Sequence, residues 1–219
     1  MVSIERILAN IRSVDHITKY RIPGDVVECG VWRGGSSMAM ALALGQEHRT
    51  FWMYDTFTGM TEATNADVSH TGDAATPWMA EAMQQGGEER DRKVCIASLE
   101  EVRANMKATG YPSTHIKFVK GPVEQTIPHE IPERIALLRI DTDWHASTLH
   151  ELTHLYPRLS PGGILIIDDY GHWQGARKAV DEYFEGQPVF LNRIDYSGRL
   201  VVKTSFEACQ PAQTHSATA

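Results

Sequence analysis

Residues 26–37, with the sequence VVECGVWRGGSS, decide the fold that this chain predicts. A short β-branched strand runs into a glycine-rich turn that opens a helix, and from Asp25 onward similar strands alternate with longer helical patterns. Such alternation is typical of βαβ units around a parallel sheet. We therefore expect an α/β chain with a doubly wound, mostly parallel sheet.

The expected elements follow from the spacing of apolar residues. Short β-branched runs predict strands at 26–29, 50–54, 116–119, 135–140 and 164–167. Apolar residues at helical spacing predict helices at 36–44, 99–109, 147–159 and 175–184, and an amphipathic helix at the start of the chain. Two further β-type segments, 189–192 and 200–203, flank a turn at 195–198 and predict an antiparallel hairpin at the end of the sheet.

The length of 219 residues suits one domain, which we place at 1–205. Residues 59–93 are rich in Thr, Asp, Gly and Ala and are too long for an ordinary connection. We interpret them as a mobile lid with a short helix near 78–84. Residues 206–219 are small and polar, which predicts a disordered tail.

Composition and charge exclude several classes of protein. The chain has 21 basic and 28 acidic side chains, a net charge of −7 and no run of Lys or Arg, which argues against nucleic acid or an anionic membrane as partner. Its 3 cysteines show no CxxC spacing, so neither a disulfide framework nor a structural zinc site is indicated. Without a signal-peptide core or a membrane-spanning stretch, we expect a cytoplasmic protein with a small-molecule partner.

The glycine-rich turn favours one cofactor over another. The dinucleotide fingerprint GxGxxG requires glycine at position 32, where this chain has Trp32, so NAD is disfavoured. S-adenosylmethionine has an adenosine but no phosphate and lacks that requirement. In this interpretation Glu28 receives its ammonium group and the turn receives its carboxylate. The turn residues assigned to the cofactor are Gly30, Val31, Gly34, Ser36 and Ser37. Alternatively, the glycines serve only to pack the helix on the strand.

The ends of the next strands complete the predicted cofactor site. Asp55 lies 20 residues after Gly35, where a doubly wound fold places an acid on a ribose diol. Its neighbours Thr56 and Phe57 are assigned with it. Candidates for the adenine pocket are Ser98, Leu99 and Gly121. Ordinary capping and turn roles are the alternative for all of these residues.

Acidic residues follow two strands that we expect to be neighbours in the sheet. Asp141 ends the segment at 139–141, and Asp168 and Asp169 end the segment at 164–169. Three carboxylates packed together repel one another unless a cation lies between them. An all-oxygen ligand set favours Mg²⁺, with Mn²⁺ or Ca²⁺ as alternatives, over zinc. We also assign Asp141 to the cofactor site. The alternative is that these acids cap helices or pair with Arg139 or Arg177.

A general base is expected close to the metal. Asp143 lies two residues after Asp141 and can accept a proton from an acceptor hydroxyl. His145 is the competing base. The aromatic residues Trp144, Tyr170 and Trp173 either form an apolar wall against the acceptor or belong to the core.

Taken together, four stretches resemble the macrocin-type O-methyltransferases. These stretches are residues 24–36, 54–60, 139–148 and 161–170, and the resemblance extends from about Gly24 to Lys203. It implies a class I, Rossmann-like methyltransferase sheet, S-adenosylmethionine as methyl donor and a sugar hydroxyl of a natural product as acceptor. It also implies Mg²⁺ held by Asp141, Asp168 and Asp169, a base at Asp143, a lid over the substrate and a homo-oligomer.

The chain departs from the family pattern at His145 and Ala146, where the family usually has Tyr-Glu. A short N-terminal portion suggests a simpler glycoside or another vicinal diol in place of a macrolide. A catechol-type O-methyltransferase shares the same metal and cofactor chemistry and is the alternative function. A hydrolase using the Asp141-Thr142-Asp143 motif and a binding module without catalysis are weaker alternatives.

Overall fold

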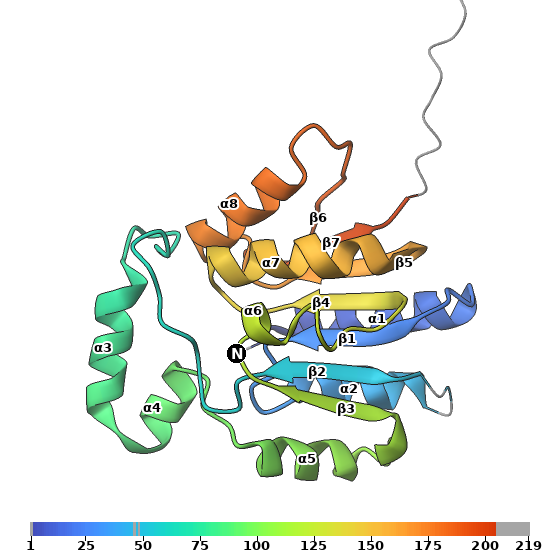
Figure 1. Ribbon diagram of the computed structural model, residues 1–219, viewed down its shortest axis with the longest axis horizontal. Helices are drawn as coiled ribbons and strands as arrows, with labels where there is room; N and C mark the ends of the chain where they lie inside the picture. Colours follow the sequence, from blue (N-terminus) through green and yellow to red (C-terminus); the bar gives the residue numbers. More distant parts are fainter. Residues whose placement is uncertain (1, 46, 48, 205–219) are drawn as a thin grey trace, which may run out of the picture.

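The computed structural model describes residues 2–45, 47 and 49–204, and its centre is a seven-stranded sheet in the order β3-β2-β1-β4-β5-β7-β6 (Figure 1). Strands β1 to β5 are parallel, whereas β7 runs antiparallel to β5 and to β6. The strands are β1 (Asp25–Cys29), β2 (Phe51–Asp55), β3 (Ile116–Lys120), β4 (Ile135–Ile140), β5 (Leu159–Ile167), β6 (Asn192–Arg193) and β7 (Arg199–Val202). The predicted parallel sheet with an antiparallel C-terminal end is confirmed.

Helices cover both faces of this sheet. The first face packs against α1 (Ile4–Lys19), α2 (Gly35–Leu44) and α5 (Leu99–Ala108). The second face packs against α6 (Val123–Thr126), α7 (His145–Leu155), the 3-10 turn η2 (Tyr156–Arg158) and α8 (Gln174–Tyr183). A second 3-10 turn, η1 (Ser113–His115), leads into β3. Because successive strand residues face opposite sides, Val26 belongs to the first core and Val27 to the second.

The lid segment lies beyond the carboxyl ends of the parallel strands. It contains α3 (Ala75–Gln85) and α4 (Gly87–Lys93), which stand apart from the sheet on the side to which β1 and β2 point (Figure 1). The expected short helix is therefore longer than predicted, and α4 was not predicted at all. Gly86 separates the two helices and Gly87 begins α4; both have positive φ, which ends α3 and lets the chain reverse.

Two predicted boundaries need correction. The helix predicted at 147–159 starts at His145 and ends at Leu155. It ends there because Pro157 has no N–H to continue the helical hydrogen bonds, and its ring would clash with the carbonyl four residues earlier. Leu159 already belongs to β5, which is longer than the predicted strand.

The predicted strand at 189–192 is also displaced. Only Asn192 and Arg193 pair, whereas Val189 and Leu191 turn their side chains onto the second core. Side-chain burial here outweighs pairing at the edge of the sheet. The tail predicted at 206–219 lies outside the described residues. No helix in the described part of the chain is long and apolar enough to cross a membrane.

Candidate active site at the carboxyl edge of the sheet

A cavity of about 530 Å³ lies between the carboxyl ends of the strands and the lid. Lid residues such as Met60, Ala74 and Trp78 line one side of it, and strand ends line the other. The predicted site residues that line this cavity are Gly30, Asp55, Thr56, Gly121, Asp141, Asp143, Asp168 and Asp169. Ligands of open α/β sheets bind at this edge. The fold therefore gathers both halves of the predicted site around one space.

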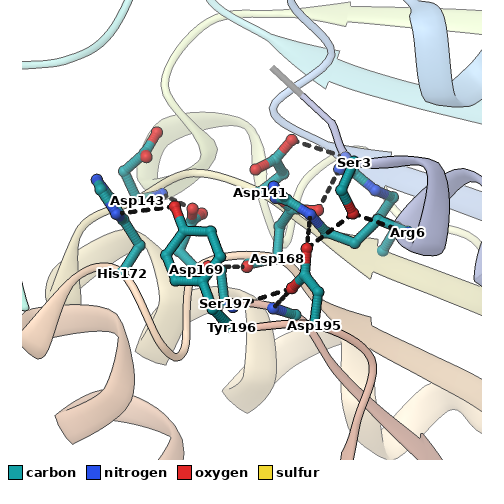
Figure 2. A network of polar contacts seen from close by, with 12 residues as sticks. Ser3, Arg6, Asp141, Asp143, Asp168, Asp169, His172, Asp195, Tyr196 and Ser197 are labelled. Carbon is teal, nitrogen blue, oxygen red and sulfur yellow. Dashed lines mark hydrogen bonds and ion pairs between the residues drawn. The ribbon is translucent and has the colours of Figure 1, made fainter.

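Three acidic residues converge at this edge because β4 and β5 are hydrogen-bonded neighbours. The pairing of Ile140 with Ile167 ends the two strands together, and the amide of Asp168 donates to the carbonyl of Ile140 at 3.0 Å. One carboxylate oxygen from each of Asp141, Asp168 and Asp169 lies within 4.8 Å of the others (Figure 2). We refer to these three residues as the acidic cluster.

Arg139 lies beneath the acidic cluster and pairs with it. Its guanidinium donates to Asp141 at 2.7 Å, to Asp168 at 2.5 Å and to Glu28 at 2.6 Å. The Arg139 and Glu28 side chains are each only 1% exposed, so this is a buried ion-pair network. Pairing of the acids with Arg139, which the sequence offered as an alternative to metal binding, is therefore present.

A second arginine reaches the cluster from α1. Arg6 pairs with Asp168 and donates through Nε to Asp195 at 3.0 Å (Figure 2). Asp195 belongs to the turn before β7, where it also accepts the amides of Ser197 and Gly198. Arg6 thus ties the first helix and the last hairpin of the fold to the end of β5.

The numbers of acidic and basic groups around the acidic cluster indicate whether it can bind a further cation. The carboxylates of the acidic cluster, Glu28 and Asp143 outnumber the two guanidinium groups. Burial raises the pKa of Asp141 and of Asp169, and neighbouring carboxylates raise both further. Such an excess of negative charge, offered by oxygen atoms alone, fits a hard divalent ion such as Mg²⁺.

Asp143 enters the cavity from a strained backbone. Its φ of +65° lies in the left-handed region, which a residue other than glycine adopts at some cost. The carboxylate accepts a hydrogen bond from Nε1 of Trp173 at 2.8 Å through Oδ1. Burial, together with the charge of Asp141, raises the pKa of Asp143 to about 8. A pKa near neutrality suits a group that takes up a proton.

The glycine-rich turn is organised around Asp55. This carboxylate accepts the backbone amides of Val31 at 2.7 Å and Trp32 at 2.9 Å, which holds Trp32 in the left-handed region with φ of +47°. Gly30 is required because a Cβ at this position would lie 1.9 Å from the carbonyl oxygen of Asp141. The turn therefore touches the end of β4 and brings the predicted cofactor site against the acidic cluster.

Comparison with known proteins identifies the family. The model of the macrocin-O-methyltransferases (TylF) matches residues 1–201. The chain belongs to the TylF macrocin-O-methyltransferase family. The resemblance predicted from four stretches of sequence is thereby confirmed.

Proteins similar to this chain come from two Streptomyces species. The chain is 38% identical over 187 residues to 8-demethyl-8-(2,3-dimethoxy-alpha-L-rhamnosyl)-tetracenomycin-C 4'-O-methyltransferase of Streptomyces olivaceus. It is 37% identical over 187 residues to demethyldecarbamoylnovobiocin O-methyltransferase of Streptomyces niveus. Each match covers 84% of this chain and 66% of the relative, so the chain spans slightly less than two thirds of the length of these proteins.

Solved structures agree with this assignment. The O-methyltransferase NovP superposes with a TM-score of 0.77 at 32% identity, covering 93% of this chain and 81% of NovP. The calicheamicin methyltransferase CalS11 superposes with a TM-score of 0.61 at 18% identity, covering 89% of this chain and 79% of CalS11, which shows a shared fold. The class I methyltransferase fold of the TylF-family chain is thus confirmed.

Several predicted cofactor residues of this TylF-family chain do not line the cavity. Glu28 faces Arg139 and Ser37 below the cavity floor, so we correct its assignment from the ammonium group of the cofactor to support of Arg139. Val31 and Phe57 pack their side chains into the first core, and Leu99 packs against its edge. Ser98 caps α5 by accepting the amide of Glu101. Gly34 and Ser36 form the start of α2, where Gly34 is the N-cap residue.

The TylF-family site brings Asp143, but not His145, to the cavity. The backbone amide of His145 begins α7 and donates to the lid residue Asp67 at 3.1 Å. Its ring turns to the far side, where Nε2 lies 2.8 Å from a carboxylate oxygen of Glu182 on α8. A general-base role for His145 is therefore not supported, because the ring faces a surface helix.

The sequence did not single out two residues that hold this site together. Arg6 is separated from Asp168 by 162 residues, so no local pattern signals their pairing. The N-cap residue of α7 makes no side-chain hydrogen bond to the helix. Asp67, which belongs to the lid, accepts the amide of the first residue of α7 instead. No pattern in the sequence around Asp67 indicates that it contacts a helix that begins 78 residues later.

Proposed function

We propose that this TylF-family chain is an O-methyltransferase that transfers a methyl group from S-adenosylmethionine to a hydroxyl of a sugar in a natural product. The observation that carries this proposal is the acidic cluster, which lies directly against the glycine-rich turn and beside Asp143. The names of the two relatives describe O-methylation of a rhamnosyl tetracenomycin and of demethyldecarbamoylnovobiocin. A third relative, at 36% identity, is the mycinamicin III 3''-O-methyltransferase of Micromonospora griseorubida.

The residues at the ends of β1, β2 and β3 would hold the methyl donor. Gly30 lines the cavity at the turn, Asp55 lies where a ribose diol is expected, and Gly121 follows β3 at the same edge. S-adenosylmethionine supplies an electrophilic methyl group when it is bound. Thr56 lines the same part of the cavity. We propose that the lid excludes water from this space.

The acidic cluster would hold Mg²⁺. When bound, the ion supplies positive charge that makes a nearby hydroxyl more acidic. Asp143 then accepts the proton of the acceptor hydroxyl at its carboxylate, while Arg139 keeps Asp141 and Asp168 in place from below. We propose a vicinal diol as the acceptor, since the acidic cluster and Asp143 line one cavity and could serve two adjacent hydroxyl groups. The homo-oligomer implied by family resemblance stays a prediction, which analytical ultracentrifugation would test.

Methyl transfer to sugars should depend on a divalent ion. Incubation with labelled S-adenosylmethionine, Mg²⁺ and a panel of glycosides and catechols should label glycosides that carry vicinal hydroxyls. Addition of EDTA should lower the rate by at least about 100-fold, since a metal ion contributes several kcal/mol to such a reaction. Excess Mg²⁺ should restore the rate. Labelling of catechols alone would favour the catechol-type alternative, and transfer that is insensitive to EDTA would contradict the metal assignment.

Replacing His145 with glutamine should leave the rate of transfer within about twofold of the wild type, because a partly exposed side-chain contact outside the cavity contributes little. The ring contacts Glu182 outside the cavity and does not face the acceptor. Steady-state kinetics of His145→Gln with the preferred glycoside would measure this. The matched variant Glu182→Gln removes the same contact from the other side and should behave alike. A large loss of kcat in His145→Gln alone would return this residue to the role of base.

A further inference from the structure

Trp173 occupies a position that the proposed mechanism does not yet use. It lies in the segment between β5 and α8, four residues after Asp169, and is 6% exposed. Its indole Nε1 donates to Oδ1 of Asp143 at 2.8 Å. An indole N–H only donates, so Trp173 cannot itself take a proton from the acceptor. Its effect on the reaction would have to pass through Asp143.

Asp143 needs an external partner to fix its side chain. Its left-handed backbone follows the end of β4 and precedes α7, so neither a strand ladder nor a helix sets its direction. Its own amide makes only a long bond, 3.3 Å, to Asp169. Among the described residues, the indole of Trp173 is the side-chain donor that reaches the Asp143 carboxylate. With Oδ1 engaged in this way, Oδ2 is the oxygen left to accept a proton.

The other side of Trp173 faces the lid. Its ring packs against Trp78 of α3, with 6.0 Å between the ring centroids, and against Trp144 at 5.0 Å. Its backbone forms an antiparallel bridge with the lid residue Ser69, and the next residue donates its amide to the carbonyl of Val68 at 2.8 Å. One residue therefore contacts both the lid and the carboxylate proposed to act as base.

We propose that Trp173 is a positioning residue that links closure of the lid to the orientation of the Asp143 carboxylate. The inference rests on the proposed function in one respect, the role of Asp143 as proton acceptor. With the lid in place, Trp78 and the Ser69 bridge fix the ring, and the ring in turn holds Oδ1 of Asp143. Displacement of the lid removes the Trp78 contact and the Ser69 bridge, so the ring and the Asp143 carboxylate that it holds become less firmly oriented.

The variant Trp173→Phe separates the two contacts, because it keeps an aromatic ring against Trp78 but removes the N–H. We expect kcat to fall by about 10- to 100-fold, as for a misplaced catalytic group, with KM for both substrates nearly unchanged. Trypsin should cleave α4 at the wild-type rate; Arg90, Arg92 and Lys93 are the lid's only tryptic sites. A wild-type kcat in this variant would overturn the proposal, as would faster cleavage, which would assign the loss to the lid.

The complementary variant Trp78→Ala removes the lid contact and leaves the indole N–H in place. Cleavage of α4 should accelerate, and KM for the acceptor should rise. A lid that stays protected in this variant would contradict the link through Trp78. Both variants contain the whole chain and are compared with the wild type under the same conditions.

A spectroscopic test of the hydrogen bond needs no methyl transfer. The five tryptophans give five indole N–H signals in an NMR spectrum of protein labelled at the indole nitrogen, and Trp173→Phe identifies the signal of Trp173 by its loss. Asp143→Ala should shift this signal to the position of an indole without an acceptor. Trp78→Ala should move it in the same direction. An unmoved signal in Asp143→Ala would overturn the proposal even if the activity is as proposed, whereas a shift in a protein without activity would count against the proposed function alone.

Discussion

Replacing Asp168 with asparagine should lower the rate of methyl transfer by at least about 100-fold, as removal of the ion does, since a metal ion contributes several kcal/mol and each 1.36 kcal/mol is a factor of ten. Asp168 is the member of the acidic cluster held by both guanidinium groups, through Arg139 at 2.5 Å and through Arg6. An amide has the same shape but no charge, so the cluster loses a carboxylate ligand while its packing is kept. Binding of S-adenosylhomocysteine, measured by calorimetry, should change little.

The control for this prediction is Asp195→Asn. Asp195 also pairs with Arg6, at 3.0 Å, but lies outside the acidic cluster. If Asp168 acts as a metal ligand, Asp195→Asn should keep most of the activity and a near wild-type affinity for Mg²⁺. An equal loss in both variants would instead attribute the effect to displacement of Arg6 and α1. Full activity in Asp168→Asn would refute the metal assignment outright.

The acidic cluster was predictable because it follows from topology. Once β4 and β5 are recognised as consecutive parallel strands, the residues that follow them must meet at one edge of the sheet. The prediction that Asp141 and Asp168 lie close together required only this strand order and no knowledge of where their side chains point. The same argument places Asp55 and Gly121 at the ends of β2 and β3. These positions depend only on strand order, which the alternation of apolar patterns indicates.

Residues whose role depends on side-chain direction were not predictable in this way. Glu28 stands on β1, next to the glycine-rich turn, and its position in the sequence suits either a cofactor contact or a contact below the sheet edge. The register of β1 with β4 pairs Glu28 with Arg139, so Glu28 makes its contact below the sheet edge. The role of a buried arginine depends on which acidic side chains surround it, and the sequence alone does not show where those side chains lie.

Contacts across long stretches of chain were also missed. Trp173 was expected either at an acceptor wall or in the core, and the structure shows its ring among tryptophans and its N–H on Asp143. Arg6 was not singled out, although its helix was predicted to be amphipathic. Both residues act through partners that tertiary packing supplies, so the periodicity of the sequence records their burial but not their contacts.

Removing the Arg139 side chain should destabilise the fold strongly, because several carboxylates lose the cation that they share. Arg139→Met keeps a long apolar side chain but leaves Glu28 and Asp168 buried without this partner. Breaking a buried ion pair by removal of one partner costs about 3–5 kcal/mol. For a chain of this length the melting temperature should fall by about 10 °C. Urea unfolding monitored by circular dichroism gives the change in the free energy of unfolding.

The pH dependence of this loss follows from the direction of the Glu28 pKa. Burial raises the pKa of Glu28, while Arg139 and the hydroxyl of Ser37 lower it. Without Arg139 the pKa of Glu28 rises further, so the folded state takes up a proton more readily than the unfolded state. Protonation therefore stabilises the folded variant, and the destabilisation by Arg139→Met should be largest at neutral pH and should shrink as the pH falls.

A second substitution tests whether Glu28 is the residue left unpaired. In the Glu28→Gln background the orphaned charge is absent, so removal of Arg139 should cost less than in the wild type, by about 1 kcal/mol or more for residues in direct contact. Equal costs in the two backgrounds would show that Glu28 does not depend on Arg139. The difference matters for the site as well as for stability, because the same guanidinium that neutralises Glu28 holds Asp141 and Asp168 at the cavity floor. We therefore expect removal of the Arg139 guanidinium to alter the spacing of the acidic cluster as well as the stability of the fold.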